Sequence, residues 1–229
     1  MSTPDSPVAS LAKTPTRDRF NDAYENRTAP WVIGEPQPAI VGLEQTGALH
    51  GKMLDAGCGL GEHTIFLTRL GYDVLGIDYA PIAVEQARAN AVAKGVDARF
   101  EVADAMNLSA EPGYDTIVDS ALFHIFDDAD RVRYVASLHN ALRAGGSLHV
   151  LALSDTGRGF GPQVSESQIR TAFGADERSR EEHALRWELE ELDTTTYRGV
   201  VGEAHADALG LAVGTRVDEP AWLARARRI

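Results

Sequence analysis

The stretch MLDAGCGLGEHT, residues 53–64, places three glycines at alternate positions directly after a short apolar run. The segment KMLDAG (52–57) predicts a buried strand, and the residues from 62 to 70 predict a helix that stops before a further glycine. Glycine lets a backbone turn tightly and approach a ligand closely. A glycine-rich turn between a strand and a helix is typical of a nucleotide-binding loop. The three glycines are Gly57, Gly59 and Gly61.

The spacing and charge of this loop argue against a dinucleotide. A dinucleotide fingerprint reads G-x-G-x-x-G, whereas this chain has G-x-G-x-G. Asp55 and Glu62 flank the loop, and their carboxylates would repel a pyrophosphate and attract a cation. S-adenosylmethionine (SAM) carries a sulfonium and an ammonium group and no phosphate. We therefore predict SAM as cofactor, with S-adenosylhomocysteine (SAH) as product, and an NAD(P) oxidoreductase as the weaker alternative.

Working outward from this loop, predicted strands and helices alternate. This pattern favours an α/β fold with a Rossmann-like, doubly wound sheet and a β-rich C-terminal end. We expect a flexible tail over 1–15 and one domain over 16–229, in which 16–50 form N-terminal lid helices. The predicted strands are 52–57, 73–78, 98–104, 115–120, 147–155, 186–197 and 222–229. The predicted helices are 37–50, 62–70, 81–94, one that Asp127 or Asp128 caps and Gly145 closes, and 165–173.

Polar side chains follow the ends of successive predicted strands, where ligands bind in open α/β sheets. Asp78 ends the second strand and can accept both ribose hydroxyls. Asp104 ends the third and can accept the adenine amino group. Asp119 and Ser120 end the fourth, near the expected position of the methionine portion and the sulfonium. Any one acid could be a helix cap or a solvated loop residue, but their succession favours cofactor binding.

Composition excludes several classes of protein. The formal net charge of −12 over 229 residues argues against nucleic-acid and anionic-membrane partners. No apolar run approaches the roughly 20 residues of a membrane span, and the N-terminus does not resemble a secretory signal. Cys58 is the single cysteine and is interpreted as a small residue in a tight turn rather than a nucleophile. His63 has no second ligand at useful spacing, so no metal is expected. We expect a cytoplasmic monomer or homodimer.

The segments LDAGCGLGEHT, LGIDYA, VADAMNL, DTIVDSALFHIF and LRAGGSLHVLALSD together resemble class I SAM-dependent methyltransferases. APWVIGEPQPAI (29–40) is similar to the N-terminal motif of the thiopurine and halide/thiol methyltransferase-like branch. Within it, the likeness is greatest to small-molecule methyltransferases that act on benzoquinones or heterocyclic toxins.

The resemblance implies a seven-stranded sheet with one antiparallel strand and a cofactor role for Trp31. Many branch members have an acid after this tryptophan, whereas this chain has Val32, so no role for that acid is carried over. The predicted cofactor contacts are Trp31, Asp55, Gly57, Cys58, Gly59, Gly61, Asp78, Tyr79, Asp104, Ala105, Asp119 and Ser120.

The acceptor site is predicted around SALFHIF, just past the fourth strand. His124 is the candidate general base, because its ordinary pKa suits proton removal at neutral pH. The alternative is a structural histidine bonded to backbone at the cofactor rim. Of Phe123 and Phe126, we expect one in the pocket and one in the core. Further candidates for acceptor contact are Phe20, Tyr24, Trp31, Asp155, and Phe160 in the glycine-rich loop 156–164.

These residues favour methyl transfer to a hydroxyl or ring nitrogen of a small heteroaromatic or quinone-like molecule. Halide or thiol methylation is the alternative within the same chemistry, and a SAM-binding sensor is the alternative without turnover. The tail and the loop over 156–164 are expected to order on binding, since a dry site needs a lid.

Overall fold

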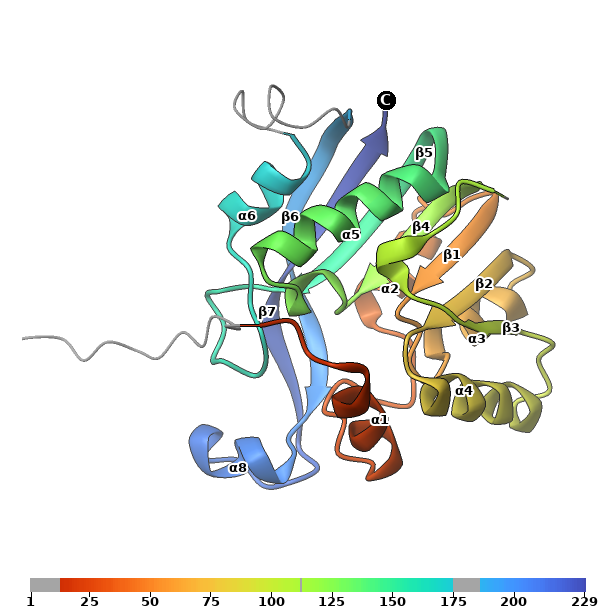
Figure 1. Ribbon diagram of the computed structural model, residues 1–229. Coiled ribbons are helices and arrows are strands. Elements are labelled where there is room, and N and C mark those ends of the chain that lie inside the picture. The colour runs from red at the N-terminus through yellow and green to blue at the C-terminus, as the bar shows by residue number, and fades with distance from the viewer. Residues whose placement is uncertain (1–12, 112, 175–185) are drawn as a thin grey trace, which may run out of the picture.

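The computed structural model describes residues 13–111, 113–174 and 186–229, in which the chain forms a seven-stranded sheet (Figure 1). The strand order is β3-β2-β1-β4-β5-β7-β6. All neighbouring strands pair in parallel except at β7, which is antiparallel to both β5 and β6. The predicted Rossmann-like sheet with one antiparallel C-terminal strand is confirmed. The strands are β1 (Lys52–Ala56), β2 (Asp73–Asp78), β3 (Arg99–Val102), β4 (Tyr114–Ser120), β5 (Leu142–Leu153), β6 (Trp187–Val200) and β7 (Arg216–Arg228).

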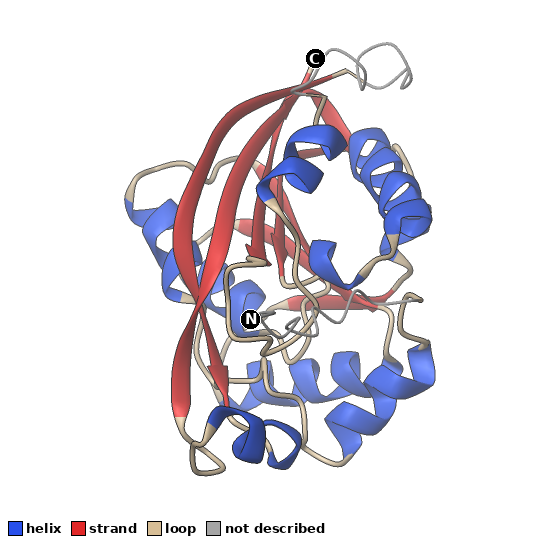
Figure 2. Ribbon diagram, turned by 90° about the vertical axis from the view of Figure 1, so that its left-hand side faces the viewer, coloured by secondary structure: helices blue, strands red, loops and turns tan. Residues whose placement is uncertain are grey.

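Helices cover both faces of this sheet (Figure 2). Neighbouring residues of β4 point to opposite faces, as the pleat requires. Ile117 joins one core with Leu138 of α5, and Val118 joins the other with Leu67 of α3. The helices are α1 (Arg17–Glu25), α2 (Pro38–Gln45), α3 (Glu62–Arg69), α4 (Pro81–Ala93), α5 (Asp128–Ala141), α6 (Glu166–Ala172) and α8 (Glu203–Leu209), with 3-10 turns η1 (Ala105–Asn107) and η2 (Phe123–Ile125).

Several helices begin at the capping residues or the proline that the sequence predicts for their N-termini. Asp127 is the N-cap of α5, and its carboxylate accepts a hydrogen bond from the Asp130 amide at 2.9 Å. Ser165 and Gln168 form a reciprocal capping box at the start of α6. Pro81 occupies the first turn of α4, where its missing N–H costs nothing.

Other boundaries differ from the sequence prediction. The helix expected over 37–50 ends at Gln45, because Gly47 takes a left-handed conformation with φ of +72°. The strand expected to reach Asp104 ends at Val102, since the Asp104 carboxylate accepts from the Met106 amide and caps η1.

The C-terminal half holds further differences. The helix expected to close at Gly145 ends earlier, because β5 begins at Leu142. The strand expected over 222–229 begins at Arg216, since β7 pairs with β6 along almost its whole length. Helix α8, inserted between β6 and β7, was not predicted.

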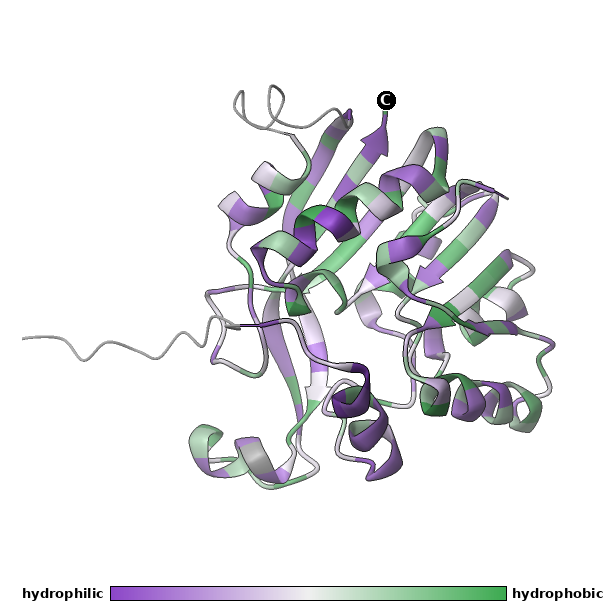
Figure 3. Ribbon diagram, in the orientation of Figure 1, coloured by the Kyte–Doolittle hydropathy of each residue, from purple (hydrophilic) through white to green (hydrophobic). Residues whose placement is uncertain are grey.

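The predicted lid region, 16–50, contains α1 and α2, and most of the predicted tail is not described. Residues 1–12 of the predicted tail lie outside the described residues, but Thr14 packs on the body of the protein. Its hydroxyl accepts a hydrogen bond from the Asp127 amide at 3.2 Å. Helix α1 follows and is largely hydrophilic (Figure 3), with Tyr24 as its buried residue.

The glycine loop after β1 enters α3 through Gly61. This residue has φ of +84°, and a Cβ atom there would lie 2.7 Å from the Phe100 ring. The loop follows β1, which pairs directly with β4. The strand order reverses between these two strands, and this switch point positions the site. Within the described ranges, no helix has the length and apolarity to cross a membrane, and no three potential metal ligands gather.

Candidate active site

A cavity of about 860 Å³ lies at the carboxyl ends of the central strands. Its floor comes from residues that follow β1, β2, β3 and β4. Its roof comes from α1, the segment around Trp31, the loop over 160–162, and α8. Residues that line the cavity include Phe20, Tyr24, Trp31, Gly57, Asp78, Tyr79, Asp104, Ala105, Met106, Ser120, His124, Phe126, Phe160, Tyr197 and His205.

Asp78 connects the glycine loop to the cavity wall. Its carboxylate accepts hydrogen bonds from the Gly59 amide at 2.9 Å and from the Ala80 amide at 2.8 Å. Burial raises the pKa of this carboxyl to about 6, although the backbone donors oppose the shift. Because a carboxylate has about four acceptor positions, Asp78 can hold the loop and still accept bonds from a ligand.

The floor continues through η1. Asp104 lines the cavity while its carboxylate accepts from the Met106 amide and from the Asn107 side chain, at 2.9 and 2.7 Å. Tyr79 lines it as well, and the Arg17 guanidinium lies 4.0 Å from the centroid of that ring. This contact joins the lid helix to the end of β2.

Three aromatic side chains form the lid above the glycine loop. The Trp31 ring packs edge-on against Phe20 and Tyr24, with ring centroids 6.3 and 5.9 Å away. The Trp31 indole N–H donates to the Tyr24 hydroxyl at 3.0 Å. A Cβ atom on Gly59 would lie 3.1 Å from that hydroxyl, so the glycine allows the lid to close onto the loop.

His124 lies on η2, just past β4, and lines the cavity. Its Nδ1 accepts a hydrogen bond from the Leu153 amide at 3.0 Å, so the neutral ring carries its proton on Nε2. Burial and the charge of Arg131 lower its pKa to about 3. This geometry argues against the general base predicted from the sequence. It matches the alternative, a histidine bonded to backbone, and leaves Nε2 as a donor.

The two phenylalanines beside His124 take different positions. Phe126 lines the cavity. Phe123 is fully buried and stacks on Phe173 with ring centroids 5.7 Å apart. Phe126 is also 6% exposed and belongs to the same core cluster as Phe123, with its ring centroid 4.6 Å from that of Tyr134. The expected division therefore holds only in part: Phe126 belongs to both the wall and the core, whereas Phe123 lies in the core alone and is withdrawn as a substrate contact.

Comparison with known proteins agrees with this architecture. Residues 53–146 match the model of a methyltransferase domain. The chain is 34% identical over 169 residues to a 2-heptyl-1-hydroxyquinolin-4(1H)-one methyltransferase of Mycobacteroides abscessus, across 67% of this chain and 74% of that protein. This chain belongs to the class I SAM-dependent methyltransferases. SAM is its cofactor, and its acceptor is a small molecule.

Two further proteins similar to this methyltransferase are connected with sulfur chemistry, one by its name and one by its solved structure. It is 28% identical over 154 residues to “Probable thiol methyltransferase 2” of Arabidopsis thaliana, across 65% of this chain and 68% of that one. A solved protein is 34% identical, with a TM-score of 0.79, across 93% of this chain and 92% of that one. Its structure concerns the conversion of a disulfide bond into a thioacetal group during echinomycin biosynthesis.

The methyltransferase cavity fits SAM on the evidence of its own side chains. Four aspartates line it and only two cations, Arg17 and Arg19, which suits a cationic ligand. The aspartates are Asp22, Asp78, Asp104 and Asp130. Ser120 lines the cavity at the end of β4, and its buried hydroxyl has no hydrogen-bond partner among the described residues. Asp78 would hold the ribose, and Asp104 with Ala105 would hold the adenine.

Two predicted cofactor acids face away from this cavity. Asp55 is 1% exposed and accepts from the Thr64 hydroxyl at 2.6 Å, which ties β1 to α3. Asp119 is fully buried and accepts from the Tyr134 hydroxyl at 2.7 Å and from two amides that follow β4. Burial raises their pKa values to about 6 and about 7. Both acids shape the loops that hold the cofactor, and neither lines the cavity.

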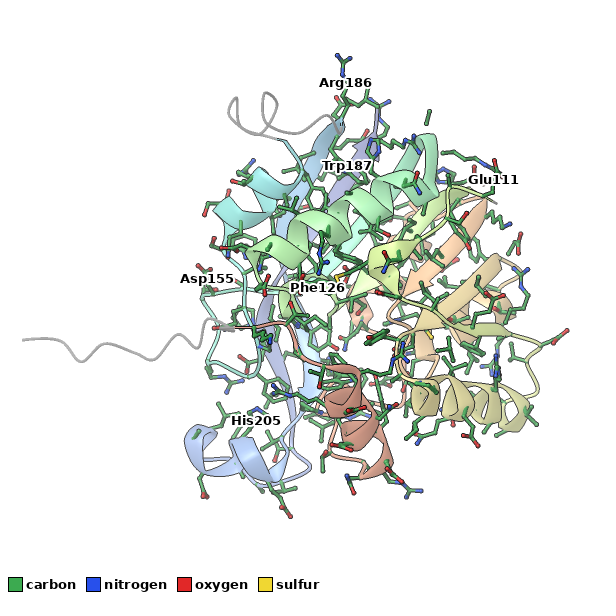
Figure 4. The ribbon with its side chains drawn as sticks, viewed as in Figure 1. Glu111, Phe126, Asp155, Arg186, Trp187 and His205 are labelled. Atoms are coloured by element: carbon green, nitrogen blue, oxygen red, sulfur yellow. The ribbon has the colours of Figure 1, made fainter. Side chains whose placement is uncertain are left out.

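Cys58 and Asp155, which were predicted to contact ligands, also lie outside the cavity lining. The Cys58 side chain packs with Ile65 and Val84 under the loop, and burial raises the pKa of its thiol, so neither a nucleophile nor a side-chain cofactor contact is supported. Asp155 is exposed and outside the cavity lining (Figure 4). Among the loop glycines, Gly57 alone is on the wall, while Gly59 and Gly61 act through backbone shape.

The glycine-rich loop over 156–164 is anchored to the C-terminal strands. The Arg158 amide and Nε donate to the Glu219 carboxylate at 3.1 and 2.8 Å, and that carboxylate is 1% exposed. Phe160 from this loop lines the cavity, as predicted. Met106, Tyr197 and His205 also line it but were not predicted. Met106 could have been found from its place next to Asp104 and Ala105, whereas the other two had no local signal.

Proposed function

We propose that this enzyme transfers the methyl group of SAM to a hydroxyl, or to a ring nitrogen, of a small flat heteroaromatic or quinone-like molecule. The observation that carries the proposal is the aromatic wall of the cavity, formed by Phe20, Trp31, Phe126 and Phe160. Flat rings gain both apolar burial and ring–ring contact against such a wall. The cavity volume of about 860 Å³ lies within the range of about 300–1,000 Å³ typical of ligand sites, and is near its upper end.

The protonation state and hydrogen bond of His124 indicate how acidic a suitable acceptor must be. When bound, SAM supplies a methyl group on a sulfonium, so the acceptor needs a nucleophilic lone pair and good alignment. The His124 Nδ1 accepts a hydrogen bond from the Leu153 amide, so the neutral ring carries its proton on Nε2. Nε2 can therefore donate a hydrogen bond to the acceptor but cannot take a proton from it. An acceptor that ionises by itself near neutral pH is therefore favoured. An N-hydroxy heterocycle is such an acceptor, and the relative named for a hydroxyquinolone supports this choice.

A thiol is the second candidate acceptor. Thiols ionise readily, so they too would react without a base, and a relative carries the name of a thiol methyltransferase. Halide methylation is less favoured, because a single ion needs none of the aromatic wall.

The test is release of SAH from SAM across a panel of hydroxyquinolones, phenols, hydroquinones, thiols and iodide, with Asp78→Ala as the cofactor-site control. We expect turnover with heteroaromatic hydroxyls, and the highest rates for those that are ionised at the assay pH. Turnover with thiols or iodide alone would refute the proposal and assign the enzyme to sulfur or halide chemistry.

A further inference from the structure

Two histidines line the cavity in the part of the chain that the structure describes, and they differ in their hydrogen bonds. The Nδ1 of His124 is occupied by the Leu153 amide. The Nδ1 of His205 is buried and has no hydrogen-bond partner. A buried polar atom without a partner is uncommon, and here it limits which ring nitrogen of His205 can carry the proton.

His205 is held on the cavity wall by Phe160. The two rings stack with centroids 5.1 Å apart and an interplanar angle of 26°. Phe160 is 3% exposed and packs with Val201 and Val217, in an apolar cluster separate from the two cores beside the sheet. A Cβ atom on Gly199 would collide with the Phe160 ring, so β6 makes room for it. The histidine ring therefore packs on a buried apolar cluster.

The hydrogen-bond state of His205 indicates which edge can meet a ligand. In neutral imidazole one nitrogen carries the proton and the other accepts. A buried N–H without a partner is rarer than an acceptor without one, so the tautomer with the proton on Nε2 is favoured. The ring then presents an N–H donor at the edge opposite the buried Nδ1.

We propose that His205 is a positioning and specificity residue for the acceptor, which donates a hydrogen bond to an oxygen remote from the methylated atom. The inference rests on the proposed function and narrows it to flat acceptors that carry a second oxygen function, such as a ring carbonyl. His124 follows directly after β4, whereas His205 lies on α8, well below Phe126 in the view of Figure 4. The two histidines therefore reach the cavity from different elements.

The test compares two acceptors in three variants. N-hydroxy-4-quinolone has a ring carbonyl, and N-hydroxyindole is a flat N-hydroxy heterocycle without one. His205→Phe keeps an aromatic ring against Phe160 and removes the donor, whereas His205→Gln keeps an N–H donor. His139→Phe is the matched control, because His139 also packs against an aromatic ring, that of Trp187, but lies outside the cavity lining.

We expect His205→Phe to raise KM for N-hydroxy-4-quinolone about tenfold, the effect of one lost hydrogen bond, with kcat and SAH affinity unchanged. KM for N-hydroxyindole should stay within about twofold. His205→Gln should recover most of the loss, and His139→Phe should behave as the wild type.

Equal effects of His205→Phe on the two acceptors would overturn the inference and leave the proposed function standing. If the wild type binds SAH but methylates neither compound, the proposed function fails and the inference fails with it.

Discussion

The floor and the roof of the cavity are built in different ways. The floor comes from loops that follow four neighbouring strands, and most of its positions are fixed by backbone hydrogen bonds, such as those from the Gly59 and Ala80 amides to Asp78. The roof combines α1 and Trp31, which are close in sequence, with Phe160 and His205, which are far from them and from each other, and these parts meet through side-chain packing. Cofactor binding is therefore a property of local sequence, whereas acceptor choice depends on long-range packing.

The largest expected effect is a loss of stability from a change in the core that supports the floor and the roof. Phe123→Ala removes a fully buried ring that stacks on Phe173, and should lower the free energy of unfolding by about 3–5 kcal/mol. Phe126→Ala, three residues along, should cost less stability and act mainly on KM for the acceptor. Urea unfolding and steady-state kinetics on both variants check this. Equal stability losses, with KM for the acceptor unchanged in Phe126→Ala, would mean that Phe126 acts through the core alone.

A smaller effect is expected on the floor. Asp78→Ala should weaken SAH binding about 100-fold, because the ribose loses its acceptors and the glycine loop loses the bonds that shape it. Isothermal titration calorimetry with SAH measures this. Asp155→Ala is the matched control, since Asp155 also follows a strand but is exposed and outside the cavity lining. A comparable loss in the control would show that any acid at this edge acts through general electrostatics.

The Asp78 carboxylate also makes binding depend on pH. With its pKa raised to about 6, the carboxyl is protonated in the free enzyme below that pH and ionised above it. The ionised form accepts hydrogen bonds more strongly, so SAH affinity should rise as the pH increases through about 6. In Asp78→Asn this rise should disappear, and its persistence would assign the titration to another group.

The smallest effect tests whether His124, on the floor side just past β4, acts as a hydrogen-bond donor or as a base. His124→Asn keeps an acceptor for the Leu153 amide and loses the Nε2 donor. We expect kcat/KM to fall by about tenfold at every pH from 5 to 9, with the shape of the profile unchanged. The reason is that a histidine with a pKa of about 3 stays neutral over this range. An acid limb near pH 6.5 that vanishes in His124→Asn would restore the base role.

Cavity residues on the floor could be predicted from the sequence more readily than those on the roof. Asp78, Asp104, Ala105 and Ser120 could be placed on the cavity from sequence, because parallel strands align their carboxyl ends at one edge. Asp55 and Asp119 could not be separated from them. Whether an acid at a strand end faces a ligand or a neighbouring hydroxyl depends on its rotamer and on partners such as Thr64 and Tyr134.

The sequence by itself determined the sheet, its glycine loop and the cofactor class, since strand–helix alternation, left-handed glycines and acids at strand ends are local signals. Only the tertiary structure decided the state of His124, through the amide of a strand 29 positions later, and brought His205 onto Phe160. Those contacts depend on how β5, β6 and the loop over 156–164 pack together. Packing between segments distant in sequence leaves no periodic trace in either segment alone.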